Sequence, residues 1–380
     1  MPPHDRRYAA EIGERFADVS ADEIAVNGTG SKYGCRLTTI PRIAIDAMGG
    51  DDAPGEIVEG TVLAHRDGLG RMTLVGDRER IAPLLVARSC ADIEIVHATG
   101  EIAMDASASQ AGRKWRGTSL GEAVELVRTG GADAVVSAGN SGAFLAIALI
   151  QLRAIPGIDR PAIAAVLPGR TGPVVLVDAG ANVDCRPEWM MQFGIMGAAY
   201  ARAALGVANP RVGIISNGEE RKKGNAQSIE AAALLANAPL HFIGNVEGKD
   251  VLNSVADVVV ADGFVGNVML KLAEGVASFF QVSLNEAFAS ASPLAKLGGL
   301  LARPAFAVMK RKLDYDTYGG APLLGVRGNC IVAHGRANRN AIRNAIKAAA
   351  LEAGANLVGA IAASVEQSAH GVGSDGFASA

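Results

Sequence analysis

The sequence predicts a doubly wound, three-layer α/β/α fold. Short apolar runs alternate with longer helical stretches, which is typical of a parallel sheet covered by helices on both faces. Six apolar runs also end at loops of Gly, Asn and Asp, namely IAIDAMGGD, AVVSAGNSG, VVLVDAGANVD, VGIISNGEERKKGN, HFIGNVEGKD and VVVADGFVGN. In such folds ligands bind beyond the carboxyl ends of the strands, where glycine-rich turns and helix N-termini suit an anion. The pattern therefore favours a site for phosphate or a phosphorylated ligand.

The first half of the chain alternates regularly. Apolar runs that end at loop residues predict strands, and the longer stretches between them predict helices. One helix has a clear start, because Thr118 or Ser119 can cap it and Glu122 follows. In chain order the predicted elements are strand Ile43–Asp46, helix Gly55–Arg66, strand Met72–Val75, helix Arg78–Ala87, strand Ile93–His97, helix Thr118–Thr129, strand Ala134–Ser137 and helix Ser141–Leu152.

The second half repeats this alternation up to a long helical region. No period of the kind found in repeat proteins is present, so we expect one continuous α/β unit. The predicted elements are strands Ala162–Leu167 and Val174–Asp178, helix Glu188–Leu205, strand Val212–Ser216, helix Gln227–Leu235, strand Val258–Ala261 and a helix that starts near Asn267.

Composition indicates a globular enzyme. Of the 380 residues 49% are hydrophobic but only 4% are aromatic, and 46 are glycine, so the core must consist of small aliphatic side chains. A formal net charge of -3 without a long basic stripe argues against nucleic acid as a partner. The cysteines stand far apart, so we expect reduced thiols, neither disulfides nor a zinc site, and a cytoplasmic location. They are Cys35, Cys90, Cys185 and Cys330.

The two ends of the chain differ from its middle. Residues 1–40 lack the apolar core of a signal peptide and predict a flexible N-terminal extension. The α/β domain is predicted at 41–365, and the segment 366–380, rich in Gly, Ser and Ala, is predicted to be a disordered tail. The longest strongly apolar stretch, Ala143–Leu152, is too short to span a bilayer, so we expect no membrane-spanning segment.

The common nucleotide and hydrolase signatures are missing. The chain has no G-x-G-x-x-G after a strand and no G-x-x-x-x-G-K-[ST], so neither a dinucleotide fingerprint nor a P-loop is predicted. It also lacks G-x-S-x-G and H-E-x-x-H. The predicted anion site must therefore use other groups.

Several long motifs resemble one family. SAGNSGAFLA, GPVVLVDAGANVDCRPEWMMQF, GEERKKGN, FIGNVEGKD, DGFVGNVMLK and YGGAPLLGV stand in the order found in bacterial phosphate acyltransferases of phospholipid synthesis. The resemblance runs from Ile43 to the helix after Asn338, and the chain departs from it in the N-terminal extension and at Ser216 and Asn217. It implies a fold similar to the phosphotransacetylases and the isocitrate/isopropylmalate dehydrogenases. It also implies transfer of the acyl group of acyl-(acyl carrier protein) to inorganic phosphate.

That chemistry needs few catalytic groups. Phosphate is largely a dianion at neutral pH, because its second pKa is about 6. The leaving thiol has a pKa of about 8.5, so a strong general acid is unnecessary. What remains is to align two reactants and to stabilise an oxyanion. We therefore expect no cofactor. The strand-end carboxylates leave Mg²⁺ as an alternative, but none of them has the tight D-x-D spacing that would support it, and no metal is predicted.

Two residues are predicted to be catalytic. Lys223, in the GEERKKGN loop, is expected to pair with phosphate or with the developing oxyanion, unless it belongs to an ordinary solvated turn. Asn267, expected at a helix start, is predicted to donate to phosphate or to the acyl carbonyl, or simply to cap the helix. The predicted phosphate- and substrate-binding residues are Gly49, Gly50, Asn140, Ser141, Asp178, Asn182, Gly224, Asn225, Asn245, Gly248 and Gly266.

Two of these groups are expected to face one crevice. The AGNSG turn with Asn140 and the DAGAN turn with Asn182 both follow predicted strands and precede helices. Two aspartates have a second interpretation. Asp178 is expected mainly to cap its turn, and Asp46 to orient its loop, since a carboxylate would repel phosphate.

The segment 275–313 predicts a protruding amphipathic helical hairpin. Apolar side chains recur at helical spacing in both of its helices, and the second helix has basic residues around it. Such a hairpin fits a dimer or core face, an anionic membrane surface, or an acidic carrier protein. The family resemblance implies a homodimer and peripheral membrane contact, and a glycerol-3-phosphate acyltransferase would be the user of the product.

Two rival functions are also compatible with the sequence. A short-chain phosphotransacetylase or a metal-dependent dehydrogenase of the same fold would use the same crevice, with a small acyl pocket or carboxylate metal ligands. A non-enzymatic scaffold for an acyl carrier or a membrane would keep the amphipathic hairpin and tolerate loss of Lys223 and Asn267.

Overall fold

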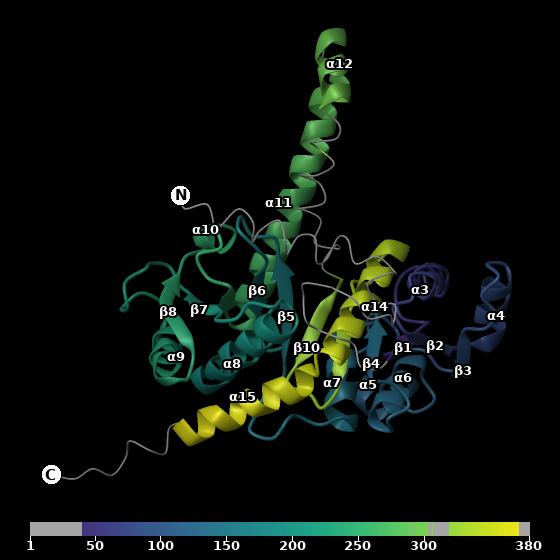
Figure 1. Cartoon of the computed structure of the whole chain (residues 1–380), viewed down its shortest axis with the longest axis horizontal. Helices are drawn as coiled ribbons and strands as arrows, with labels where there is room; N and C mark the ends of the chain where they lie inside the picture. Colours follow the sequence, from purple (N-terminus) through teal and green to yellow (C-terminus); the bar gives the residue numbers. More distant parts are fainter. Residues whose placement is uncertain (1–39, 291, 303–305, 307–318, 372–380) are drawn as a thin grey trace, which may run out of the picture.

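The computed structural model describes residues 40–290, 292–302, 306 and 319–371. Within them, eleven strands form one sheet in the order β3-β2-β1-β4-β11-β10-β5-β6-β9-β7-β8. Helices cover the sheet, and one long helix projects far from it (Figure 1). The predicted N-terminal extension lies outside the described residues except for residue 40, and residues 372–380 lie outside them as well.

In the first half every predicted strand and helix is present, with ends that differ from the predicted ones by at most one residue. Thr118 caps its helix, because its side chain accepts from the Gly121 amide. The short helix α5 was not predicted. The elements are β1 (Arg42–Asp46), α3 (Gly55–Arg66), β2 (Arg71–Gly76), α4 (Arg78–Val86), β3 (Glu94–His97), α5 (Ala108–Arg113), α6 (Ser119–Arg128), β4 (Ala134–Ser137) and α7 (Ser141–Gln151).

The second half contains the predicted elements and several that were not predicted, among them the short Gly248–Val251, Ala321–Leu324 and Asn329–Val332 and the 15-residue helix Leu357–Gly371. The last helix continues to Gly371, past the domain end expected at residue 365, so the first part of the predicted tail is helical. The elements are β5 (Ala162–Leu167), β6 (Val174–Val177), α8 (Pro187–Ala203), β7 (Arg211–Ile215), α9 (Ala226–Asn237), β8 (His241–Val246), α10 (Gly248–Val251), β9 (Val258–Val260), α11 (Gly263–Ser290), α12 (Pro293–Leu301), β10 (Ala321–Leu324), β11 (Asn329–Val332), α14 (Arg339–Gly354) and α15 (Leu357–Gly371).

The sheet is mixed and consists of two parallel blocks. Strands β3, β2, β1, β4 and β11 are parallel to one another, as are β6, β9, β7 and β8. Between the blocks, the pairings β11–β10, β10–β5 and β5–β6 are all antiparallel. Three reversals make the second block run opposite to the first. The strands of the two blocks therefore have their carboxyl ends on opposite sides of the sheet. We call these two sides, where the strands end, the edges of the sheet.

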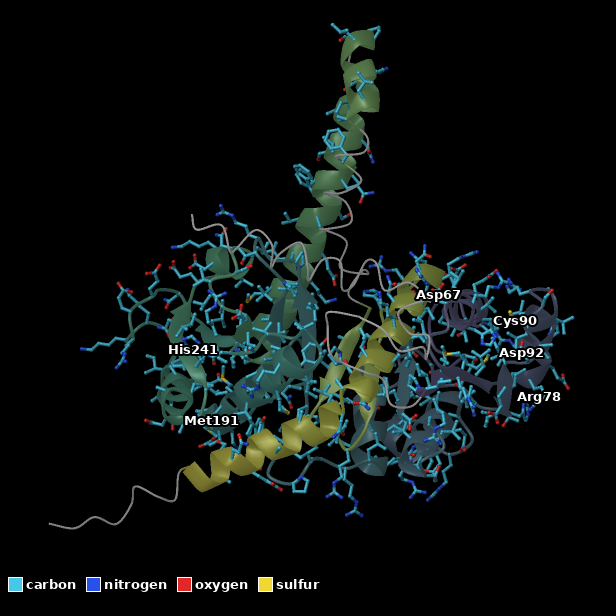
Figure 2. The ribbon with its side chains drawn as sticks, in the orientation of Figure 1. Asp67, Arg78, Cys90, Asp92, Met191 and His241 are labelled. Carbon is cyan, nitrogen blue, oxygen red and sulfur yellow. The ribbon has the colours of Figure 1, made fainter. Side chains whose placement is uncertain are left out.

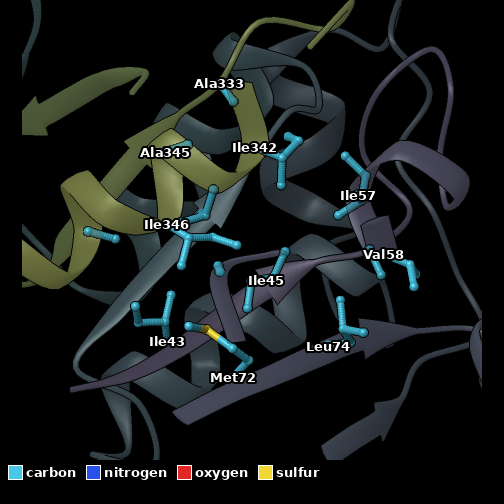
Figure 3. Packing of buried hydrophobic residues seen from close by; sticks show 14 of the residues in the cluster. Ile43, Ile45, Ile57, Val58, Met72, Leu74, Ala333, Ile342, Ala345 and Ile346 are labelled. Carbon is cyan, nitrogen blue, oxygen red and sulfur yellow. The ribbon is translucent and has the colours of Figure 1, made fainter. Parts of the chain in front are cut away.

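Small aliphatic side chains fill the core on both faces of the first block. On one face, Ile342 and Ile346 of α14 pack with Ile57 of α3 over Ile43 and Ile45 of β1 (Figure 3). On the other face, α6 and α7 cover the same strands, with a separate cluster that includes Phe144 and Val135. This arrangement confirms the predicted three layers.

Helices α8, α9 and α15 cover one face of the second block. Phe193 of α8 is fully buried there among Val177, Val212 and Val260. The opposite face packs Leu176 and Val259 against residues at the base of α11. Strands β6 and β9 therefore have buried positions on both faces, as is typical of parallel sheets.

Helix α11 extends from this base as a long arm, with α12 near its tip (Figure 1). Figure 2 draws the side chains along the arm, which project from it over most of its length. Apolar side chains on it are exposed, including Phe279 at 73% and Leu294 at 79%. Phe288 contacts Phe306 edge to face, with ring centroids 5.5 Å apart. The predicted hairpin at 275–313 is thus present as far as residue 302, and most of its later part lies outside the described residues.

No single helix among the described residues is both long and apolar enough to cross a membrane. One bent pair, Arg339–Gly354 with Leu357–Ala369, meets the length and composition criteria only when taken together, with a 54° angle between its helices. Both helices of this pair contribute residues to the buried core clusters, such as Ile346 and Ile361.

Candidate active site

Three helix N-termini meet at the carboxyl ends of β6, β7 and β9. Helix α8 follows the turn after β6, α9 follows the loop after β7, and α11 follows β9 directly. Asn225 caps α9 by accepting from the Ser228 amide at 2.8 Å, whereas the start of α8 has no side-chain cap. Because each helix directs unpaired N–H groups and partial positive charge to its N-terminus, this edge of the sheet suits an anion.

The turn after β6 is built around Asp178. Its carboxylate is fully buried and accepts from the backbone amides of Ile163, Gly180, Ala181 and Asn182 and from the Asn182 side chain, at 2.7–3.1 Å. Burial raises the pKa of Asp178, and these hydrogen bonds oppose the shift. Asp178 therefore holds the turn, as its capping interpretation predicts. Asn182 supports the same turn, since its side chain also donates to Pro161 O at 2.8 Å.

Helix α11 packs its first turns directly onto this turn. The Gly263 amide donates to Asn182 O at 2.8 Å, and a Cβ at Gly266 would overlap Asp178 O. Gly266 is therefore required for the close packing of α11 on the turn. The predicted binding role of Gly266 becomes a packing role in this geometry.

The prediction that Asn267 starts the helix is wrong. Helix α11 begins earlier, at Gly263, and Asp262 caps it by accepting from the amides of Phe264 and Val265. Asn267 thus lies in the second turn, where its side chain is half-buried beside Gly180. It has no hydrogen-bond partner among the residues that the structure describes. Its amide group is consequently available to a ligand, which a capping residue would not be.

A pocket of about 450 Å³ lies between the starts of α9 and α11. The Ser216 hydroxyl is buried in its wall and has no hydrogen-bond partner within the described part of the chain. Such an unsatisfied group is costly unless a ligand or water pairs with it. The pocket combines apolar and polar side chains, and its lining comprises Met190, Ile215, Ser216, Asn217, Gly224, Asn225, Gln227, Ser228, Asp262 and Val265.

Lys223 lines a second pocket of about 400 Å³, which shares Asn217 with the first. Its side chain is exposed, and its stem lies over Gly218. Three carboxylates also line this pocket, those of Glu219, Glu220 and Glu247. Lys223 is therefore near the proposed anion site, but among acidic neighbours that reduce the local positive potential.

The remaining predicted residues on this side support the loop. Asn245 donates to the carbonyl oxygens of Glu220 and Lys223, at 2.8 and 3.3 Å, and so holds the lysine loop in place. Gly224 precedes the cap residue of α9 with a φ of +117°, and Gly248 is the first residue of the short helix α10. Glu219, Glu247 and Asp250 bring three carboxylates within 4.8 Å of one another, but Glu247 pairs with Lys249.

The other predicted residues lie at the opposite edge, so the expectation of one shared crevice is wrong. Asn140 caps α7 and donates to Met104 O and Ala106 O, at 2.7 and 2.9 Å, which uses its whole amide group. Ser141 begins α7 and is exposed. The physical reason is the three successive antiparallel pairings between β11 and β6, an odd number, which reverse the second block.

At this opposite edge the loops after β1 and β4 are packed together. A Cβ at Gly49 would lie 2.5 Å from Asp46 Oδ2 and 2.8 Å from Gly139 N, and Gly50 has a φ of +118°. Asp46 is buried and accepts from the Ser137 hydroxyl at 2.7 Å and the Met48 amide at 3.2 Å. Burial raises its pKa, and these hydrogen bonds lower it in part. Asp46 thus orients its loop, as predicted.

Two residues near the pocket were missed by the sequence prediction. Gln227 donates to Cys185 O at 2.8 Å and to Met190 Sδ at 3.4 Å, which ties α9 to the start of α8. Cys185 donates its thiol to Asn182 O, and burial raises its pKa to about 11. Cys185 stands within the motif GPVVLVDAGANVDCRPEWMMQF, but nothing in the sequence indicates its contact with Gln227, which joins distant segments.

Comparison with known proteins shows which protein family the chain resembles. A family model described as "Fatty acid synthesis protein" matches residues 41–358. A phosphate acyltransferase of Geotalea daltonii is 49% identical over 80% of this chain and 89% of its own length, and one of Pelotomaculum thermopropionicum is 50% identical over 81% and 90%. These similarities extend through both edges of the sheet.

Solved structures share the fold at low sequence identity. The EutD phosphotransacetylase of Staphylococcus aureus matches with a TM-score of 0.56 and 14% identity, over 91% of this chain and 99% of that one. A phosphotransacetylase of Streptococcus pyogenes matches with a TM-score of 0.57 and 18% identity, over 83% and 95%. The predicted fold relationship is thereby confirmed. With half of its aligned residues identical to those relatives, the chain belongs to the phosphate acyltransferase family.

Proposed function

We propose that this protein transfers a fatty acyl group from acyl-(acyl carrier protein) to inorganic phosphate, giving acyl phosphate for phospholipid synthesis. Family membership supports the reaction. The location of the phosphate site is supported by the convergence of three helix N-termini on one pocket. The Ser216 hydroxyl in the wall of this pocket is unsatisfied, and the Asn267 amide nearby is unpaired, among the described residues. These groups provide hydrogen-bond donors for an anionic acceptor and for the oxyanion that its attack creates.

In this reaction a phosphate oxygen attacks the thioester carbonyl carbon. A C–O bond forms, the carbonyl oxygen becomes an oxyanion, and the C–S bond then breaks to release the carrier thiol. We assign phosphate to the starts of α9 and α11, with the Asn267 amide donating to phosphate or to the oxyanion. Lys223, on the adjoining loop, is proposed to reach the same anion with its flexible side chain.

Direct attack by phosphate is favoured over an acyl-enzyme. Cys185 is the cysteine near the turn after β6, and a pKa of about 11 keeps its thiol protonated at neutral pH. No histidine lines either of the two pockets to act as its base. A protonated, half-buried thiol that donates to a backbone carbonyl is a poor nucleophile.

The arm supports a further part of the proposal. Apolar side chains are exposed along α11 and α12, and their burial is favourable at about 25 cal/mol per Å². We propose that the arm pairs with a second copy in a homodimer and that its tip contacts an anionic membrane surface. A cytoplasmic protein in peripheral contact with the membrane could hand its lipophilic product to a glycerol-3-phosphate acyltransferase.

The test is acyl phosphate formation from a long-chain acyl-(acyl carrier protein) and inorganic phosphate. We expect phosphate-dependent thioester loss with the intact chain, and a fall of about 100-fold in kcat/KM for Lys223→Ala. Lys222→Ala is the matched control, because Lys222 is exposed on the same loop but lies outside the pocket lining. Equal losses for both variants would mean that the loop contributes only general charge.

The same assay separates the rival functions. Turnover restricted to short acyl chains would indicate a short-chain phosphotransacetylase, and metal-dependent oxidation of a phosphorylated alcohol would indicate a dehydrogenase of this fold. Carrier binding without any turnover by the folded chain would indicate a scaffold and would overturn the acyltransferase proposal.

A further inference from the structure

Two arginines share one indole ring beside the candidate site. The guanidinium carbon of Arg160 lies 5.0 Å from the centroid of the Trp189 ring, and that of Arg186 lies 5.4 Å from it. Both arginines are exposed, and Trp189 is half-buried. Cation–π contacts of this kind fix the planes of the two guanidinium groups. Within the described ranges neither group forms an ion pair, so both retain donors for an external acceptor.

The backbone that carries these arginines is held firmly in place. Gln192 of α8 accepts from the Asp159 amide at 3.0 Å and donates to the Asp159 carboxylate at 3.1 Å. Two residues later Pro161 O accepts from the Asn182 side chain. The segment that carries Arg160 is therefore attached both to α8 and to the turn after β6. Such preorganisation lowers the entropy cost of binding a partner.

The pair also lies next to the pocket. Arg186 immediately precedes α8, whose first turn contributes Met190 to the lining. Its neighbour Cys185 is bonded through its carbonyl oxygen to Gln227, which lines the same pocket. A group bound by the two arginines would therefore lie at the side of the pocket formed by α8.

Local charge defines the kind of partner. Asp184 and Glu188 are exposed near Arg186 in the sequence, so the face carries charges of both signs rather than a broad basic field. Recognition then depends on the two planar guanidinium groups, which bind carboxylates in a bidentate manner. A protein surface with paired carboxylates fits this arrangement better than a diffuse anion does.

We propose that Arg160 and Arg186, held against Trp189, form the docking contact for the acidic acyl carrier protein that delivers the thioester. This inference rests on the proposed function and extends it, because it assigns residues to the protein part of the donor rather than to the acyl group or phosphate. Docking here places the carrier beside the α8 wall of the pocket.

The test compares a carrier-bound donor with a carrier-free donor of the same acyl chain. For the Arg160→Gln/Arg186→Gln variant of the full chain we expect KM for acyl-(acyl carrier protein) to rise about tenfold, with kcat and KM for phosphate changed less than about twofold. KM for the matching S-acyl pantetheine should not change. Added salt should raise the wild-type KM for the carrier donor more steeply than that of the variant.

Arg202→Gln is the matched control, because Arg202 is exposed at the other end of the same helix. Arg186→Lys keeps the charge but not the planar group, and it should lie between wild type and the double variant. If the double variant loses thermal stability, the single Arg160→Gln change, in the exposed segment before β5, provides the same comparison with a KM increase of about threefold.

Two results would overturn the inference. One is an unchanged KM for the carrier donor in the folded double variant, and the other is an equal loss with S-acyl pantetheine, which would assign the pair to the small-molecule site. Failure of the proposed function is recognisable separately, because then the wild-type chain would form no acyl phosphate from either donor.

Discussion

The two edges of the sheet carry the same kind of sequence but different structures. At the edge formed by β1, β4 and β11, the Gly-, Asn- and Asp-containing loops pack against one another. The side chains of Asn140 and Asp46 form hydrogen bonds there with other groups of the protein. At the edge formed by β6, β7 and β9, the loops enclose a pocket of about 450 Å³, and polar groups of Ser216 and Asn267 remain unpaired among the described residues.

This difference shows that a glycine-rich loop after a strand is not in itself a binding site. At the first edge glycine allows loop-on-loop contact, since Gly49 lies against Gly139. At the second edge Gly266 brings α11 onto the turn, and the helix N-termini are left facing a cavity. What distinguishes the edges is whether the polar groups are already satisfied.

The largest effect should come from the packed edge. Gly49→Ala places a Cβ against the Asp46 carboxylate and the Gly139 backbone, so we expect a loss of about 3 kcal/mol in the free energy of unfolding. Gly55→Ala is the control, because its Cβ would have no neighbour within 4 Å. Urea denaturation measures both variants. A Gly49→Ala protein of normal stability but without activity would instead place the site at this edge.

At the open edge the expected effect is on activity. Asn267→Ala removes an amide without a protein partner, so we expect kcat to fall about 100-fold while the free energy of unfolding changes by less than about 0.5 kcal/mol. Steady-state kinetics and urea denaturation on one preparation check both numbers. A stability loss that accounts for the activity loss would remove Asn267 from the site.

A smaller effect distinguishes the two capping asparagines. Asn140→Ala and Asn225→Ala each remove an N-cap, which costs about 1 kcal/mol of stability. Only Asn225 also lines the pocket, so only its variant should raise KM for phosphate. A KM effect of equal size in both variants would break the distinction between the edges.

The smallest expected effect is on the pH dependence of stability, through a buried carboxyl group that lacks a hydrogen-bond partner. Glu352 is fully buried with Oε1 unpaired within the described ranges, and burial raises its pKa well above 4.5. The pKa of Glu352 is higher in the folded protein than in the unfolded chain. Its protonated form therefore stabilises the fold fully at pH values below the unfolded-state pKa, and this stabilisation is lost as pH rises through the folded-state pKa. Glu352→Gln should therefore be more stable than wild type at pH 8, by about 1 kcal/mol, and similar at pH 4. Denaturation at a series of pH values gives this difference, and a constant difference across the series would contradict it.

Sequence reasoning predicted the local structure well and the arrangement of the sheet less well. Helix Gly55–Arg66 and strands Ala134–Ser137 and Ala162–Leu167 have the predicted bounds, because apolar spacing is a local signal. The strands β10 and β11 carried no prediction. Yet two of the three antiparallel pairings that together reverse the second block involve β10.

The candidate site shows the same limit. Asp178 and Asp46 hold their turns as their positions after strands predict. Asn267 was expected at a helix start, as a ligand donor or a cap, because DGFVGN resembles a loop. Asp262 instead caps the helix, which begins at Gly263, and the Asn267 amide is left without a partner among the described residues. The unsatisfied Ser216 hydroxyl depends on which side chains meet across α9 and β7, and a sequence pattern does not contain that information.

We propose that phosphate binds at the edge formed by β6, β7 and β9. Amide hydrogen exchange with and without saturating inorganic phosphate tests it most directly, because exchange reports local protection along the backbone. We predict slower exchange at 225–228 and 263–267 and no change at 49–51 and 141–143. Protection at 49–51 and 141–143 alone would contradict the account and would move the site to the opposite edge.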